Sequence, residues 1–140
     1  MRFDRTLTGL LLLPLLLLGC GKSGPKVAPV SGRVTLDKKP LANADIVFSP
    51  TESGADKSAK LESSSRTDAQ GHYSLQMIED KRGGALVGAH KVRISQMERG
   101  TSLTNRVPRA YNENTTLTFT VTPEGTKEAN FDLTKDGRGK

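Results

Sequence analysis

The sequence predicts an all-β protein, an antiparallel β-sandwich of about seven strands. Three observations favour this fold class: apolar and polar residues alternate with period two in several short runs, threonine and other polar residues occupy one face of these runs, and turn-forming residues separate them. A strand places successive side chains on opposite faces, so the pattern is typical of a sheet with one buried and one solvated face. The segments between these runs show no convincing helical periodicity.

The first strands are predicted by the runs at 30–36 (VSGRVTL) and 44–49 (ADIVFS). Ile46 and Phe48 share one face of the second run, with Val47 opposite. In the first run, the shared face carries Val30, Gly32, Val34 and Leu36. A long polar segment at 51–65 follows, and its end overlaps a weak strand at 63–67.

Four later runs continue the alternation, at 72–77, 87–95, 116–122 and 130–133. The most regular is TLTFTVT at 116–122, which places four threonines on the outer face. The residues expected to face inward are Tyr73, Leu75, Met77, His90, Val92, Ile94, Leu117, Phe119, Val121, Phe131 and Leu133. Together the runs provide about seven strands in one domain, as in a sandwich.

Turn-forming residues separate these runs at 37–40, 68–71 and 123–126. In the second turn, Asp68 precedes Gly71 by three residues. This spacing suits a type I turn with a glycine bulge, in which the aspartate side chain accepts hydrogen bonds from the backbone of its own turn.

The N-terminus has the pattern of an export signal. Arg2 and Arg5 precede an apolar run from Leu7 to Leu18, which is about a dozen residues and shorter than the ~20 that a transmembrane helix needs. Arginines before such a run hold that end on the cytoplasmic side. We therefore expect residues 1–19 to be a signal peptide.

The signal ends in Leu17-Leu18-Gly19-Cys20, which resembles the lipobox of bacterial lipoproteins. The resemblance implies cleavage between Gly19 and Cys20 and a lipid thioether on the Cys20 thiol. Cys20 is the only cysteine in the chain, and a thiolate is the nucleophile that this chemistry requires. The alternative is an ordinary signal peptide with a chance cysteine.

Gly21-Lys22-Ser23 also has the letters of a phosphate-binding loop. Such a loop needs a glycine five positions before the Gly-Lys pair, where this chain has Leu16. The prolines that follow, Pro25 and Pro29, oppose the helix that should come next. The sequence therefore does not predict nucleotide binding.

These features predict four regions along the chain. They are a signal peptide at 1–19, the lipidated cysteine and a flexible tether at 20–29, the sandwich at 30–134 and a disordered tail at 135–140. The expected location is extracytoplasmic and membrane-anchored, at the periplasmic face or the cell surface.

Five stretches together resemble the carboxypeptidase regulatory-like domain, in particular the version carried by small bacterial lipoproteins. They are VSGRVTLDKKPLANADIVFSP, TDAQGHYSL, VGAHKVRIS, VPRAYNENTTLTFTV and NFDL, within residues 29–134. The resemblance implies a seven-stranded, transthyretin-like sandwich that accompanies catalytic domains and performs no chemistry itself. Gln70 departs from the family pattern, which often has an acid at that position.

No catalytic, cofactor or metal site is predicted. His72 and Asp68 could be combined with a serine among Ser63–Ser65, but no nucleophile elbow or ordered spacing supports a hydrolase. We interpret His72 as a solvated turn residue and His90 as a partly buried strand residue. Asp68 and Gln70 resemble the start of a calcium loop that lacks its later acidic ligands.

The net charge of +6 does not by itself indicate nucleic acid, because the basic residues are dispersed and aromatic residues make up 4% of the chain. The expected partners are instead the membrane, through Cys20, and an envelope protein or polysaccharide. Candidate docking loops are 37–41, 51–65 and 98–112. Tyr111, with Arg109 beside it, is either a packing residue or a weak candidate for ligand contact.

Overall fold

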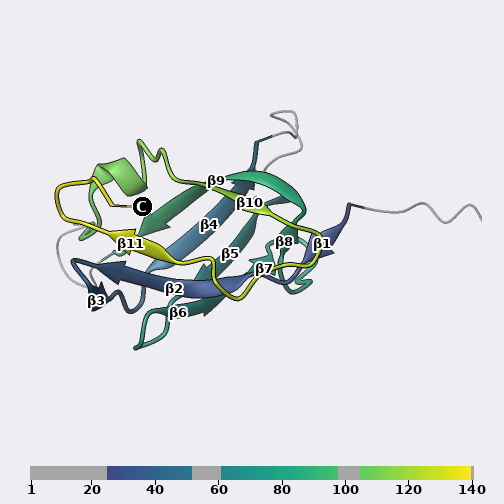
Figure 1. Cartoon of the computed structure of the whole chain (residues 1–140), viewed down its shortest axis with the longest axis horizontal. Helices are drawn as coiled ribbons and strands as arrows, with labels where there is room; N and C mark the ends of the chain where they lie inside the picture. The colour runs from purple at the N-terminus through teal and green to yellow at the C-terminus, as the bar shows by residue number, and fades with distance from the viewer. Residues whose placement is uncertain (1–24, 52–60, 98–104, 140) are drawn as a thin grey trace, which may run out of the picture.

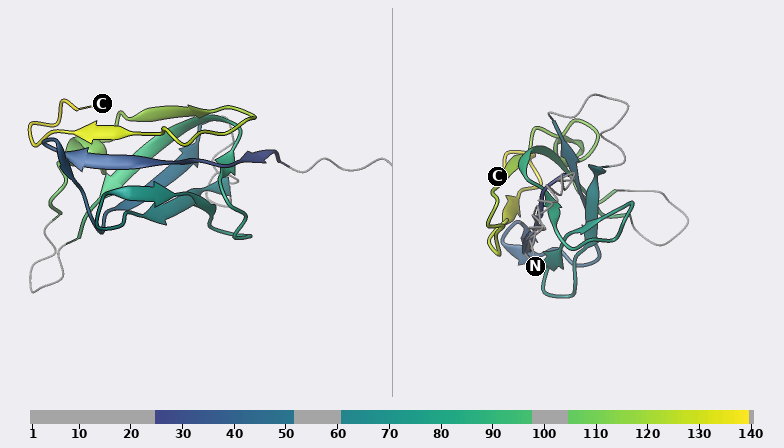
Figure 2. Two further views of the ribbon diagram at one scale, coloured as in Figure 1. Left: turned by 60° about the horizontal axis from the view of Figure 1, so that its bottom comes forward. Right: turned by 90° about the vertical axis from the view of Figure 1, so that its right-hand side faces the viewer.

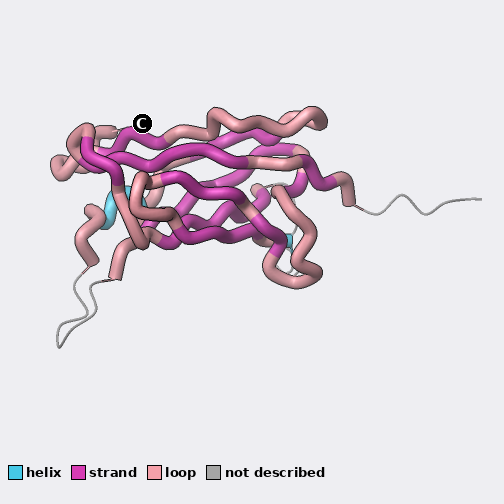
Figure 3. The backbone as a smooth tube through the Cα atoms, turned by 90° about the horizontal axis from the view of Figure 1, so that it is seen from below, coloured by secondary structure: helices cyan, strands magenta, loops and turns pink. Residues whose placement is uncertain are grey.

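The computed structural model describes residues 25–51, 61–97 and 105–139. They form an all-β, sandwich-like fold in which two sheets pack face to face (Figures 1 and 2). Strands and connecting turns alternate along the described chain (Figure 3). Seven described strands have three residues or more, which agrees with the predicted number.

The larger sheet has five strands, each antiparallel to its neighbours. Their order is β10 (Thr118–Val121), β9 (Gly88–Ser95), β4 (Asp45–Pro50), β5 (Ser63–Arg66) and β7 (Gln76–Met77). The weak strand predicted at 63–67 is therefore a member of this sheet. β5 pairs with β4 through the backbone over four residues.

The smaller sheet is built around β2 (Ser31–Leu36). Three short strands pair with it: β11 (Phe131–Leu133), β3 (Lys39–Pro40) and β6 (His72–Ser74). The pairing of β11 with β2 is parallel, so the expectation of a purely antiparallel sandwich is wrong at this position. The chain crosses from the larger sheet after β10, and a parallel bridge between Val30 and Thr126 brings it alongside β2 before β11 begins.

The run at 72–77 forms two strands rather than the one predicted. β6 pairs with β2, whereas β7 pairs with β5 in the other sheet. Between them Leu75 donates its backbone N–H to Val30 and accepts one from Gly84. The buried faces of Tyr73, Leu75 and Met77 are nevertheless as predicted, because the chain changes sheets without reversing its alternation.

Both ends of the sandwich extend beyond the expected limits of 30 and 134. β1 (Val27–Ala28) pairs with β8 (Ala85–Leu86), so part of the predicted tether is strand. Residues 135–139, expected to be disordered, form a turn with defined hydrogen bonds that are described below. The signal peptide and residues 20–24, the first half of the predicted tether, lie outside the described residues.

The turn at Asp68–Gly71 has the hydrogen bonds that the sequence predicts. The Asp68 carboxylate accepts the backbone N–H groups of Gln70 and His72, both at 2.9 Å, and Gly71 has a positive φ of 81°. A Cβ at Gly71 would also stand 2.4 Å from the Val34 carbonyl oxygen. Glycine is therefore required at this position by its conformation and by the close approach of β2.

The core lies between the sheets and is centred on aromatic rings. Phe48 of β4 is 0% exposed, and its ring centroid lies 5.7 Å from Phe119 and 6.1 Å from Phe131. Phe131 belongs to the smaller sheet, so these contacts join the two layers. The inward faces of the predicted strands supply most of the other buried residues, which confirms the period-two assignments.

Candidate functional site

Two of the three predicted docking loops meet at one end of the sandwich. The 37–41 segment and the described part of 98–112, residues 105–112, lie at the end that also carries the C-terminus (Figure 1). β4 runs from this end to the opposite one, so Thr51 and the start of the 51–65 segment lie at the other end. We call the end that carries the 37–41 segment and residues 105–112 the distal end, because it lies away from β1.

A groove of about 610 Å³ opens at the distal end. Its apolar residues are Leu36, Pro40, Leu41 and Ala42, and its polar residues are Asp37, Lys39, Gln96, Arg106 and Lys135. Asp37 is the single carboxylate among these residues, and its Oδ2 lies 3.8 Å from Lys135 Nζ. The described lining of the groove therefore combines an excess of positive charge with several apolar residues.

Side-chain amides connect the segments that line the groove. Gln96 donates from its Nε2 to the carbonyl of Ala42, across 54 residues of sequence. The Oδ1 of Asn105 accepts the backbone N–H groups of Gln96 and Val107, both at 3.0 Å. Nothing in the sequence spacing indicated this role for Gln96 or Asn105, since the contacts depend on how β4 and β9 are paired.

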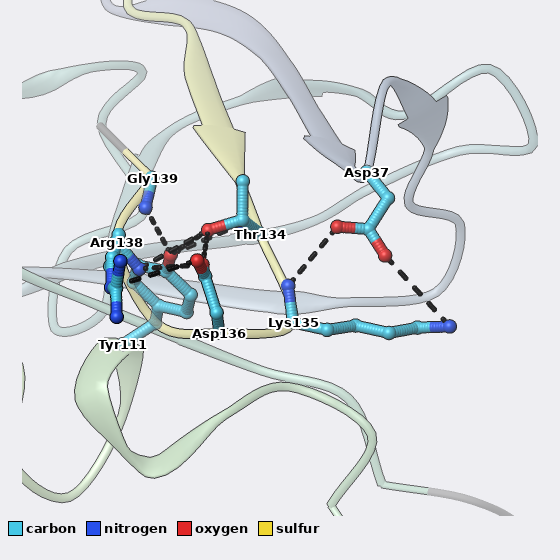
Figure 4. Close-up of polar contacts among 7 residues, drawn as sticks. All are labelled: Asp37, Tyr111, Thr134, Lys135, Asp136, Arg138 and Gly139. Carbon is cyan, nitrogen blue, oxygen red and sulfur yellow. Dashed lines mark hydrogen bonds and ion pairs between the residues drawn. The ribbon is translucent and has the colours of Figure 1, made fainter.

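Tyr111 holds the distal end together (Figure 4). It ends the short 3₁₀ helix η2 (Arg109–Tyr111), and its side chain is buried, with 1% exposed. Its hydroxyl oxygen accepts the backbone N–H of Thr134 at 3.1 Å and that of Gly139 at 2.5 Å, and lies 3.1 Å from the Thr134 hydroxyl. The packing interpretation of Tyr111 is therefore correct, and its ring is not available to stack on a ligand.

The C-terminal turn continues this network. Thr134 donates its hydroxyl to Asp136, and the Thr134 Oγ1 and Asp136 carboxylate both accept the backbone N–H of Arg138. The Thr134 hydroxyl, followed by the Arg138 N–H, lowers the pKa of Asp136 below its ordinary value. Asp37 accepts the backbone N–H of Lys135 at 3.1 Å, which attaches the turn to the β2–β3 connection (Figure 4).

Arg109, the other weak candidate for ligand contact, is exposed beside Tyr111. Its guanidinium lies 2.6 Å from the Glu113 carboxylate, and both side chains are largely in solvent. An exposed pair of this kind contributes ~0–1 kcal/mol to stability. Arg109 therefore contributes surface charge at the distal end and is not part of the groove wall.

The residues considered for a hydrolytic site do not all converge. Ser63 is fully buried, and its hydroxyl lies 3.1 Å from the Met77 sulfur. His72 is exposed on the outer face of the smaller sheet, with Nδ1 3.9 Å from Asp68. The described segments also contain no cluster of three or more His, Cys, Asp or Glu side chains that could hold a metal ion.

His90 is more deeply buried than the sequence suggested, with 1% of its surface exposed. Its Nδ1 lies 3.0 Å from the Gly88 carbonyl, so Nδ1 carries the proton of the neutral ring. Nε2 has no hydrogen-bond partner among the residues that the structure describes, and the centroid of the Phe48 ring lies 5.7 Å from that of the imidazole. Desolvation lowers the pKa of His90, with a smaller opposing effect of the Gly88 hydrogen bond.

We expect the free energy of unfolding to fall as the pH drops below 6.5, the ordinary imidazole value, because the unfolded chain then binds a proton that folded His90 resists. The difference in free energy of unfolding between wild type and His90→Leu should change by up to about 1.4 kcal/mol per pH unit. Denaturant titrations at several pH values measure it. His72→Gln, which changes an exposed imidazole, is the control. A His90→Leu curve parallel to wild type would contradict the prediction.

Comparisons with protein-family models, curated proteins and solved structures found no match for this chain. Gly19 and Cys20, the predicted cleavage and lipidation positions, lie outside the described residues. Within the described segments, no helix has the length and apolar character needed to span a bilayer.

Proposed function

We propose that this chain is a lipid-anchored, extracytoplasmic β-sandwich domain that acts as a non-enzymatic interaction or scaffold module. We also propose that this domain is of the carboxypeptidase regulatory-like, transthyretin-like type that its sequence resembles. It is supported by the Leu17–Cys20 pattern, which directly follows an apolar run of signal-peptide length. Diacylation of Cys20 would provide the two chains that stable membrane attachment requires.

The observation that carries the proposal is the position of the groove relative to the attachment point. β1 begins at Val27, at the end of the sandwich opposite β3 (Figure 1). The groove is lined by residues of the distal end, around β3. Residues 21–26 span at most about 20 Å when extended, so an anchor at Cys20 would keep the β1 end close to the lipid. The cationic, partly apolar groove would then face away from the membrane, where a partner could reach it.

The test is crosslinking in cells followed by affinity capture and membrane fractionation, on the native protein and on Cys20→Ser. We expect the native protein in the membrane fraction with a small set of envelope proteins, and Cys20→Ser in the soluble fraction without them. Serine cannot replace the thiol, because the thiolate is the nucleophile in lipid attachment.

Two further variants locate the partner surface. Lys39→Glu reverses a charge on the groove wall and should reduce capture. Lys91→Glu makes the same change on the exposed face of β9 and should leave capture as it is. If Cys20→Ser remained membrane-bound, the anchor would be refuted; equal capture by both glutamate variants would exclude the groove.

The second candidate function is a carbohydrate- or peptide-binding module of the cell envelope. Tyr111, the aromatic residue first considered for this role, is buried and engaged at the distal end. A different surface supports the candidate: a shallow polar concavity on the outer face of the smaller sheet.

A further inference from the structure

The outer face of the smaller sheet carries a shallow concavity of about 520 Å³. The polar side chains of its lining come from β2, β6, β11 and the segment before β11, and all of those named below except the buried Thr35 are exposed. We call them the Arg33 face: Arg33, Thr35, His72, Lys127, Asn130 and Asp132. No motif in the sequence indicates a role for Arg33 or Lys127.

We propose that the Arg33 face binds a carboxylate-bearing polysaccharide, with Arg33 and Lys127 contacting its acidic groups. This inference deepens the second candidate function and does not depend on the lipid anchor. It rests on how the side chains of this face are held and on which donors and acceptors they leave for a ligand.

Arg33 is oriented by the Asp68–Gly71 turn. Its Nε donates to the carbonyl oxygen of Gln70 at 3.0 Å, and the N–H of Gln70 is held in turn by the Asp68 carboxylate. Among the described residues, the terminal amino groups of Arg33 have no hydrogen-bond partner. A guanidinium held by one edge can donate its other N–H groups to a carboxylate as a pair of parallel hydrogen bonds. Because it is already oriented, the side chain loses less conformational entropy when the ligand binds.

The neighbouring polar groups are oriented as well. Asn130 accepts the backbone N–H of Arg33 with its Oδ1 at 2.9 Å, so its amide nitrogen remains a donor. The Thr35 hydroxyl donates to Asp132 Oδ1 at 2.6 Å, which leaves the second carboxylate oxygen as an acceptor. Lys127 makes no ion pair or hydrogen bond with other described residues through its ammonium. The face thus offers two cations, an oriented amide donor and a carboxylate acceptor.

This set of groups fits an acidic sugar polymer better than a peptide. Among the described residues that line the concavity, Tyr73 is the single large apolar side chain, and it is itself buried, with its hydroxyl donated to the Ala129 carbonyl. A peptide would find no pocket for an apolar anchor, whereas sugar hydroxyls need both donors and acceptors. Uronate units add the negative charge that complements Arg33 and Lys127.

The test uses the purified full-length protein in detergent, with immobilised polygalacturonate as the acidic polymer and dextran as a neutral one. We expect binding to polygalacturonate at low salt and none to dextran. Arg33→Gln and Lys127→Gln should each weaken binding about tenfold, the size of one charge-assisted hydrogen bond. Arg109→Gln removes the same charge at the distal end and should change binding less than about twofold, since it removes only distant attraction.

Thermal unfolding of each variant separates lost binding from lost structure. Lys127→Gln is the more reliable variant for this purpose, because it breaks no described side-chain contact. No binding to polygalacturonate, or equal losses in all three variants, would overturn the proposal. Complete competition by polyphosphate at equal charge would also overturn it, by indicating a general anion site. The membrane and capture results for Cys20→Ser are unaffected by any of these outcomes, so the two proposals fail separately.

Discussion

Phe48→Ala should lower the free energy of unfolding by about 3–5 kcal/mol, the usual cost of truncating a buried phenylalanine. Phe48 is 0% exposed and packs against Phe119 of its own sheet and Phe131 of the other. Its removal would leave a cavity between the layers, and neighbouring rings attached to paired strands can move only partly to fill it. Urea titration of the full chain in detergent measures the change.

Two variants calibrate this result. Phe48→Leu keeps an apolar side chain at the position and should cost less than Phe48→Ala. Phe119→Ala removes a ring that is only partly buried, so the loss should also be smaller. If Phe119→Ala were as costly as Phe48→Ala, the core would be centred on β10 instead of lying between the sheets.

Tyr111→Phe should lower the free energy of unfolding by about 1–3 kcal/mol and release the C-terminal turn. The substitution keeps the buried ring but removes the oxygen that accepts the N–H groups of Thr134 and Gly139. Both donors would then need water at a site that is partly closed to it. Denaturant titration measures the stability, and hydrogen exchange at residues 134–139 measures the release.

Asp136→Asn is the matched control for this second prediction. It alters the same turn at an exposed position while leaving the Tyr111 contacts in place, so it should change stability by less than about 1 kcal/mol. Unchanged exchange at residues 134–139 in Tyr111→Phe would show that the turn is held by other contacts, such as Asp37 with Lys135.

The groove and the Arg33 face differ in how far the sequence predicted them. The 37–41 and 98–112 loops were predicted as docking segments, but the hydrogen bond between Gln96 and Ala42, which lie next to these loops, was not. Arg33 is an outward position of a correctly predicted strand, so its exposure followed from the alternation. Its partner Gln70 is 37 residues away, and no local pattern indicates such a contact.

The sequence by itself determined the all-β class, the inward and outward faces of the strands and the Asp68–Gly71 turn. These features depend on neighbours one to four residues apart, where backbone geometry alone decides which way a side chain points. The tertiary structure alone decided that β11 runs parallel to β2, that the chain changes sheets at Leu75 and that Tyr111 closes the distal end. Each of these depends on contacts between distant segments, because a strand pattern is satisfied by any partner that covers its apolar face.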